Sequence, residues 1–351
     1  MTYRRAQTLV SYWRQGRLVL ENYVTGRRVD AIPTIVSILD RASDWRTADA
    51  FVGPHDASLG PRVRRLVRAL ERATLLERRD DRDNEDLEPW APWLPHAGLI
   101  HFGTKDEEYQ APLKAARQFR ARSRIRPCPP PTKSYPPRLR IALPAPASVG
   151  PTLQAALEAR RTWRRFGRSP MSRQDLATVL GLTWGVRRWA RDDAGNRVAL
   201  KTAPSGGAMH PIEVYVAAFN VAGLARGLYH YDAARHALAR VGPIRSRLRA
   251  GRYLPSQPWY RGAAALFLMT AVVGRELWKY DSPRAYRAML IDAGHLCQTC
   301  CLVATALNLA PFCSMALADS VIERDLGLDG VSEIALYAAG VGNRPRGATM
   351  P

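Results

Sequence analysis

The chain has 351 residues, 46% of them hydrophobic, so it is long enough for a sizeable core and its length favours two domains. No charge-poor apolar run reaches the ~18–20 residues of a membrane span, and no apolar stretch follows the first five residues, which predicts a cytoplasmic protein without signal peptide or membrane segment. The net charge of +21 favours anionic partners, such as a phosphorylated cofactor, an acidic peptide or nucleic acid, without choosing among them.

Residues 1–125 are expected to form a small amino-terminal module of the winged-helix or peptide-clamp type. Residues 17–30 have the pattern of an extended segment or a hairpin around Thr25-Gly26. Two apolar stripes at helical spacing follow, formed by Ile35, Leu39 and Ala42 and then by Val63, Leu66, Val67 and Leu70. The acidic run 80–88 is typical of a solvated loop.

The segment 126–150 is rich in proline, which prevents helix and favours an extended linker, so we expect the domain boundary there. Residues 151–351 then alternate between helical and strand patterns, which predicts an α+β layer structure. The expected elements are a helix at 175–180 capped by Ser172, strands at 212–219, 263–273 and 333–341, a hairpin at 228–241 and a helix at 285–309. The last helix is apolar nearly all round and belongs in a core or a subunit interface.

Five cysteines, three of them within positions 297–301, do not suit a secreted disulfide framework. Cys297 and Cys300 have the spacing of a redox or zinc pair, but no second pair or His-x-x-x-His supplies further ligands. We therefore expect reduced thiols that pack as small apolar residues, and no metal site.

Three clusters of residues contain groups that could bind a ligand or take part in catalysis. The run 160–166 places four arginines and the Thr162 hydroxyl close together, a donor set that can hold a phosphate dianion or form a solvated charge run. The run 202–211 contains Pro204, Ser205, Gly206 and Gly207 and can be a plain turn or a loop that approaches a flat ligand.

The third cluster is Lys279-Tyr280, just before the long helix. A lysine beside a tyrosine supplies a base and a proton donor, although a surface lysine at a helix entry would have the same pattern. Lys279 is one of only five lysines in an arginine-rich chain.

The ordered set of these clusters, with Gly227-Leu-Tyr-His-Tyr-Asp between the second and third and Gly294-His295 after them, resembles the SagB-type FMN-dependent dehydrogenases of the nitroreductase superfamily. The resemblance covers about 155–345 and extends loosely to 90–93 and 101–106. It implies a nitroreductase-like fold, a mixed sheet flanked by helices, in a homodimer that binds FMN between its chains.

The resemblance also implies roles for residues. The phosphate and ribityl groups would be held by Arg160, Arg161, Thr162, Arg164 and Arg344, and the flavin would be lined by Pro204, Ser205, Gly206 and Gly207 and approached by the backbone at Ser314. Lys279 would be the catalytic base and Tyr280 its partner, in the oxidation of azoline rings to azoles in a ribosomally made precursor peptide. A cyclodehydratase is the implied partner and oxygen the final oxidant.

Departures from the family pattern leave the substrate open. Asp292 and Thr299 stand where Glu and Asn are expected, and Asn308 where glycine is usual. A flavin oxidoreductase for another peptide, a carrier-bound molecule or a small molecule therefore stays an alternative. From a different class come a non-catalytic scaffold and a DNA-binding protein, for which Arg62, Arg64, Arg65 and Arg68 would line one helix. We consider nucleic acid the less favoured partner, because acidic residues follow that helix.

Overall fold

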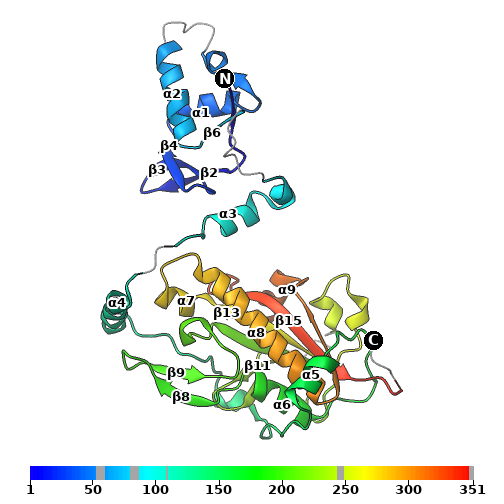
Figure 1. The fold of residues 1–351 in the computed structure, drawn as a ribbon. Helices are drawn as coiled ribbons and strands as arrows, with labels where there is room; N and C mark the ends of the chain where they lie inside the picture. The colour runs from blue at the N-terminus through cyan, green and yellow to red at the C-terminus, as the bar shows by residue number, and fades with distance from the viewer. Residues whose placement is uncertain (53–59, 80–86, 108–109, 243–248, 348–351) are drawn as a thin grey trace. The chain divides into compact units, whose positions relative to one another are not determined.

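The computed structural model describes residues 1–52, 60–79, 87–107, 110–242 and 249–347, which form two compact units divided at 109/110. The predicted acidic loop at 80–88 lies almost wholly outside the described residues. Figure 1 shows the elements of both units, which are treated separately below.

The first unit contains two three-stranded antiparallel sheets and short helices. One sheet has the order β5 (Arg46–Thr47), β1 (Thr2–Arg5), β6 (Leu76–Arg78), and the other β2 (Leu9–Arg14), β3 (Arg17–Asn22), β4 (Arg27–Asp30). The helices are α1 (Pro33–Arg41), α2 (Gly60–Arg72) and α3 (His96–Phe102), with 3-10 turns at Ala48–Phe51 and Glu88–Trp93. The predicted hairpin is confirmed as β3–β4, with Gly26 at φ +69° in its turn.

Both predicted apolar stripes of this unit are confirmed as helix faces. Ile35 and Leu39 of α1 and Val67 and Leu70 of α2 are buried in one core with Tyr3 of β1. The arginines of α2 lie on its exposed face, where Arg64 forms an ion pair with Asp49 (2.6 Å).

The second unit is built on a seven-stranded sheet with the order β14-β15-β13-β10-β11-β12-β7. The strands are β7 (Arg140–Ala142), β10 (Ile212–Ala218), β11 (Gly227–Asp232), β12 (Ala237–Arg240), β13 (Ala265–Val272), β14 (Leu309–Ser314) and β15 (Glu333–Asn343). All described pairings in this sheet are antiparallel, whereas the sequence predicted a mixed sheet. A separate two-stranded ribbon joins β8 (Arg188–Arg191) and β9 (Arg197–Leu200).

The second unit also contains helices. They are α4 (Pro112–Ile125), α5 (Leu153–Ala159), α6 (Arg173–Thr183), α7 (Val273–Lys279), α8 (Ala285–Ala306) and α9 (Asp319–Leu326), and short 3-10 turns lie at Pro137–Leu139, Gly206–Ala208, Ala250–Arg252 and Pro258–Tyr260. One core cluster joins α6 and α8 to the sheet, and a second joins α9 to it. Figure 1 shows α8 crossing the face of the sheet. Ser172 caps α6 as predicted, accepting a hydrogen bond from the Asp175 N–H (2.9 Å).

The α8 helix ends earlier than predicted. It stops at Ala306, and Leu309 already begins β14, because Asn308 adopts a left-handed backbone conformation (φ +58°) that breaks the helix. Asparagine is one of the few residues other than glycine that adopts this conformation readily, which accounts for its presence where the family pattern has glycine.

By length and composition α8 could also cross a membrane, which corrects the expectation that no apolar run is long enough. Half of its most apolar window is buried within this unit, however, as in the core helix of a globular domain. The helix packs on α6, β14 and β15, so its apolar character serves this fold.

The proline-rich segment is held against the second unit. The structure groups 110–150 with that unit, whereas the sequence placed the first module at 1–125 and a free linker at 126–150. Residues 140–142 add β7 to the edge of the large sheet, and Lys133 forms a partly buried ion pair with Glu333 of β15 (2.6 Å). Proline excludes a helix here but not an extended path along the sheet.

Candidate active site

Lys279 and Tyr280 end α7 and contact the glycine loop. The Lys279 Nζ donates a hydrogen bond to the carbonyl oxygen of Gly207 (2.8 Å). A Cβ atom added to Gly207 would stand 2.7 Å from that Nζ and even closer to the Tyr280 hydroxyl. The structure thus brings together the predicted catalytic pair and a predicted flavin-lining residue, separated by more than 70 positions in sequence.

The backbone of this loop requires its glycine. Gly207 has φ +57°, a conformation that disfavours side chains, and the close approach of two side chains leaves no room for one. The loop is tied to α8 through Ser205, whose Oγ donates to Asp292 (2.5 Å) and accepts from the His210 N–H (2.9 Å). Asp292 is therefore the residue of α8 that positions the loop.

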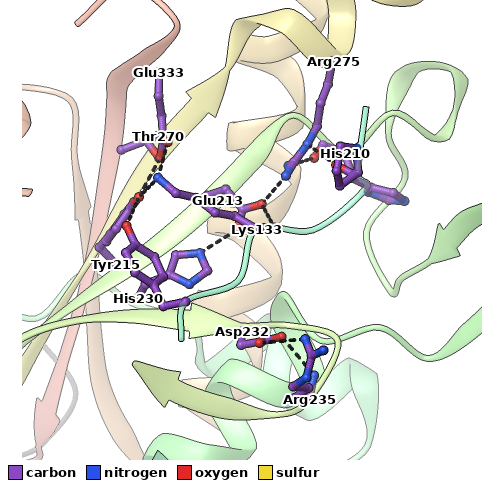
Figure 2. A network of polar contacts seen from close by, with 12 residues as sticks. Lys133, His210, Glu213, Tyr215, His230, Asp232, Arg235, Thr270, Arg275 and Glu333 are labelled. Atoms are coloured by element: carbon purple, nitrogen blue, oxygen red, sulfur yellow. Dashed lines mark hydrogen bonds and ion pairs between the residues drawn. The ribbon is translucent and has the colours of Figure 1, made fainter. Parts of the chain in front are cut away.

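A buried polar network fixes the beginning of α7 (Figure 2). Arg275 donates to Glu213 of β10 (2.6 Å) and to the His210 carbonyl oxygen (2.9 Å), and it is only 3% exposed. Glu213 also accepts from His230 (2.9 Å). Burial alone would raise the pKa of Glu213, but the Arg275 guanidinium and the His230 hydrogen bond hold it below its usual value.

The end of α7 is held by α4. Arg122 donates to the carbonyl oxygens of Trp278 (2.9 Å) and Lys279 (2.8 Å) and forms an ion pair with Asp281. These carbonyls are among those that a helix leaves unsatisfied at its carboxyl end. Lys279 is consequently held at its backbone by Arg122 and at its side chain by Gly207.

Glu276 lies one turn before Tyr280 and was missed by the sequence analysis. Its side chain is buried, and neither carboxylate oxygen has a hydrogen-bond partner among the described residues. Burial, with the nearby charge of Asp292, raises the pKa of Glu276 to about 7, against the opposing effect of Lys279. Burial likewise raises the pKa of Tyr280, with Glu276 and Asp292 adding to the effect.

Lys201, at the start of the glycine loop, is a second ionisable residue that the sequence analysis missed. Burial lowers the pKa of Lys201 to about 8, with Glu213 and Asp292 opposing this change and Arg275 adding to it. Perturbed groups of this kind gather at functional sites. For Glu276, the sequence held only a weak indication of a role: this residue stands three positions before Lys279, on the same helix face.

The predicted phosphate-binding residues form a second group beside β14. Arg160 ends α5, and the Trp163 N–H donates to the Pro311 carbonyl oxygen of β14 (2.9 Å). Arg344 stacks over the Trp163 ring at 5.1 Å and donates to the Leu309 carbonyl oxygen (3.1 Å). The structure thereby brings Arg344 to the arginine run, and its role at a phosphate stays a prediction.

Other members of the predicted set have different surroundings. The Arg161 guanidinium turns back to the carbonyl oxygens of Glu158 and Arg160 (2.8 Å each), whereas the side chain of Arg164 is exposed. Thr162 is half-buried between them. Ser314 donates to Gln257 (2.7 Å) at the end of β14.

The two groups contact different parts of α8. The glycine loop contacts α8 at Asp292, and β14 contacts α8 at Cys301. These two positions are nine residues apart along the helix, a distance of about 14 Å. Within one chain, the glycine-loop group and the arginine group therefore do not form a single compact cluster.

A family model described as "Nitroreductase family" matches residues 157–343, more than half of the chain. This chain belongs to the nitroreductase family. The matched range contains the arginine run, the glycine loop and Lys279-Tyr280. Membership makes the chain a flavin oxidoreductase with an α+β nitroreductase fold, preceded by the strands and helices of the first unit.

Two named relatives are similar to parts of the chain. The trifolitoxin-processing protein TfxB of Rhizobium leguminosarum bv. trifolii is 36% identical over 146 residues, which are 39% of this chain and 38% of that protein. A Methanocaldococcus jannaschii protein described as a nitroreductase, MJ1384, is 29% identical over 50% of this chain and 83% of its own length. The chain thus spans well under half of the first relative's length.

Two solved structures are similar to part of the chain. A nitroreductase-type protein from Ralstonia eutropha covers 61% of this chain and 97% of its own (23% identity, TM-score 0.48). The Escherichia coli microcin synthetase McbBCD complex, solved with truncated pro-MccB17 bound, covers 69% of this chain and 85% of its own chain (20% identity, TM-score 0.42).

The residues present suit a flavin mononucleotide. Arg160, Thr162, Arg164 and Arg344 supply charged donors and a hydroxyl for a phosphate dianion. The glycine loop offers backbone without side chains next to a lysine and a tyrosine, as a flat ring system needs. A bound flavin would supply a two-electron acceptor at this place.

Proposed function

We propose that this chain is an FMN-dependent dehydrogenase that oxidises azoline rings to azoles in a ribosomally made precursor peptide. The observation that carries the proposal is the contact of Lys279 and Tyr280 with Gly207, since it combines a base, a proton donor and a flavin-lining loop in one place. The similarity to TfxB, which is named for processing a peptide toxin, supports a peptide as the substrate.

The side chains divide the acid and base roles. Burial raises the pKa of Tyr280, so its phenol stays protonated and can donate a hydrogen bond to the substrate. Lys279 would take the proton from the ring Cα, and a bound flavin would supply the acceptor for the second hydrogen and its two electrons. The Gly207 carbonyl oxygen orients the lysine amine for this step.

A homodimer would complete the site. The arginine group and the glycine-loop group lie apart along α8, and a flavin contacted by both chains would need one group from each. Apolar side chains on the exposed side of α8 support such a contact: Leu290 is 45% exposed and Ile291 is 56% exposed. We also propose a cytoplasmic location, where reduced thiols are stable.

The first unit is the proposed docking module for the precursor peptide. Its strand β2 lies at the edge of a three-stranded sheet, and Trp13 on that strand is 73% exposed. An extended leader peptide could add to such an edge by main-chain hydrogen bonds. A cyclodehydratase that makes the azoline is the proposed protein partner.

The proposal is tested with the purified full chain. Its visible spectrum is recorded and any released chromophore identified, and we expect about one FMN per chain. A precursor peptide already carrying azolines is then added without oxygen, and bleaching of the flavin should accompany the loss of two hydrogen atoms per ring. A flavin that the azoline peptide leaves oxidised would refute azoline oxidation but not the fold.

The match over 83% of MJ1384, which is described as a nitroreductase, supports a flavin oxidoreductase in general. The second candidate is therefore such an enzyme acting on another peptide, a carrier-bound molecule or a small molecule. The leader peptide separates the two. Turnover that disappears when the leader is removed favours azoline oxidation, whereas turnover indifferent to the leader favours this candidate.

The DNA-binding and scaffold hypotheses have separate tests. Arg62, Arg65 and Arg68 on the exposed face of α2 would give salt-sensitive retention on duplex DNA if the first unit bound nucleic acid. A colourless chain that takes up no added FMN would instead favour a scaffold without catalytic activity.

A further inference from the structure

Three thiols meet between α8 and β14. Cys297 and Cys301 stand one helical turn apart on the same face of α8, and Cys313 faces them from β14. The three Sγ atoms all lie within 4.8 Å of one another, and none forms a disulfide. Cys297 and Cys301 are buried and Cys313 is half-buried.

We propose that Cys297, Cys301 and Cys313 bind a thiophilic divalent cation of the Zn²⁺ type. The sequence analysis foresaw no metal site because it paired Cys297 with Cys300 and found no further ligand. The fold provides that ligand from β14, twelve residues beyond Cys301. This inference does not depend on the azoline substrate.

The distances suit such an ion. A Zn–S bond is about 2.3 Å long, so three sulfurs around one Zn²⁺ are roughly 4 Å apart. Since the present separations do not exceed 4.8 Å, an inward movement of at most about 1 Å per pair closes the site.

The charges around the thiols also suit a cation. The Arg160 guanidinium acts electrostatically on Cys301 and Cys313. Binding would displace the thiol protons and leave three thiolates around a divalent ion, a net charge of −1 beside that guanidinium.

Thiolate ligands select the class of ion. Sulfur donors favour Zn²⁺ and similar soft ions over Mg²⁺ and Ca²⁺, which prefer oxygen. The half-buried Cys313 provides the route of entry. A bound ion would join α8 to β14 immediately before Ser314, and would stabilise the strand end that the family resemblance places near the flavin.

Cd²⁺ is the probe for the experiment, because thiolate coordination gives it an ultraviolet charge-transfer band. The reduced, metal-free full chain is titrated with Cd²⁺, and affinities are obtained by competition with a chelator. We expect one ion per wild-type chain. Cys297→Ala, Cys301→Ala and Cys313→Ala should each bind at least about 100-fold more weakly.

Cys300→Ala is the matched control, since Cys300 is equally buried on α8 but lies outside the cluster. It should bind like the wild type. Equal weakening by Cys300→Ala, or a wild-type chain that binds no Cd²⁺, overturns the proposal. A chain that binds no cation when reduced but forms a disulfide to Cys313 when oxidised also overturns it, in favour of a redox pair.

A second measurement covers variants that fail to fold. Zn²⁺ at 100 times its Kd should raise the unfolding temperature of the wild-type chain by roughly 5–10 °C. Mg²⁺ at the same concentration should not. An unfolding temperature that Zn²⁺ leaves unchanged would contradict the proposal without any substitution.

Discussion

Two groups of buried acidic residues in the second unit have opposite surroundings. Glu213 and Glu333 are surrounded by donors: Arg275 and His230 bond the first, and Lys133, Tyr215 and Thr270 bond the second (Figure 2). Glu276, by contrast, lies buried with both oxygens unpaired among the described residues. The first arrangement fixes a fold, and the second leaves a carboxyl group that can gain or lose a proton near neutral pH.

The difference follows from which charges surround each acid. Positive groups stabilise the charged form of Glu213, whereas Glu276 has another acid, Asp292, among its neighbours. Glu276 belongs to α7, and Glu213 is bonded by Arg275 of the same helix. A single short helix therefore connects the rigid network to the carboxyl group that titrates near neutral pH.

Breaking the paired group should have the largest effect. Arg275→Leu leaves Glu213 buried without its guanidinium, and we expect the free energy of unfolding to fall by about 3–5 kcal/mol. Denaturant unfolding measures this change. The control is Arg191→Leu, an exposed arginine that bonds the Gly195 carbonyl oxygen, which should change it by no more than about 0.5 kcal/mol. Similar losses in both variants would contradict the importance of the network.

Lys279→Met tests the candidate active site directly. Removing the proposed base should slow flavin reduction by an azoline peptide about 10²- to 10⁴-fold, with flavin content unchanged. Stopped-flow absorbance of the flavin gives the rate. Lys114→Met, at an exposed position of α4, should leave it unaffected. An undiminished rate in Lys279→Met would assign the base elsewhere.

Gly207→Ala should separate site geometry from backbone strain. Gly195 also has a positive φ (+83°), but nothing lies within 4 Å of an added Cβ atom there. The positive φ alone should cost about 1–2 kcal/mol of stability in each variant, and the close contacts should add to this cost in Gly207→Ala. Only Gly207→Ala should also displace Lys279 and slow flavin reduction, by roughly 100-fold. Equal rates in the two variants would show that the close contact is not needed.

Glu276→Gln should give the smallest effect, visible only as a function of pH. Because burial raises the pKa of Glu276 from 4.5 to about 7, its contribution to stability is fully present below pH 4.5 and is lost as the pH rises through 7. The variant should match the wild type near pH 4.5. Above pH 7 it should be more stable by about 1–2 kcal/mol, less than the full shift implies because solvent screens the charge.

Unfolding curves at several pH values check this expectation, with Glu158→Gln as the control. Glu158 is an exposed residue of α5. A stability difference that does not change with pH would mean that Glu276 keeps one protonation state throughout.

Local patterns predicted most of the secondary structure. The hairpin β3–β4, the cap at Ser172 and the buried strand β13 follow from turn residues, hydroxyl caps and continuous apolar runs. The candidate site residues came from the family resemblance and stay a prediction. The contact of Gly207 with Lys279 was not predicted, since local spacing does not state which loops meet.

What escaped prediction depended on tertiary neighbours. Glu276 is a single acid in a charged helix, and only burial distinguishes it from a solvated one. Cys313 lies beside Cys297 and Cys301 because β14 packs on α8. The proline-rich segment lies along the sheet, where Lys133 forms an ion pair with Glu333. Each of these depends on long-range pairing that a linear pattern does not encode.

The hydrogen bonds from Arg122 to the end of α7 limit how far the chain can be shortened. The family match begins at residue 157, yet the backbone of Lys279 is bonded by Arg122, which lies 35 positions before the start of that match. Lys133, which bonds Glu333, lies before the match as well. A fragment cut at the family border would keep Lys279 and Tyr280, the proposed catalytic residues, but would lose Arg122 and Lys133. The shortest fragment that keeps these contacts therefore begins before α4. Moving the proposed active site into another protein would require moving that helix as well.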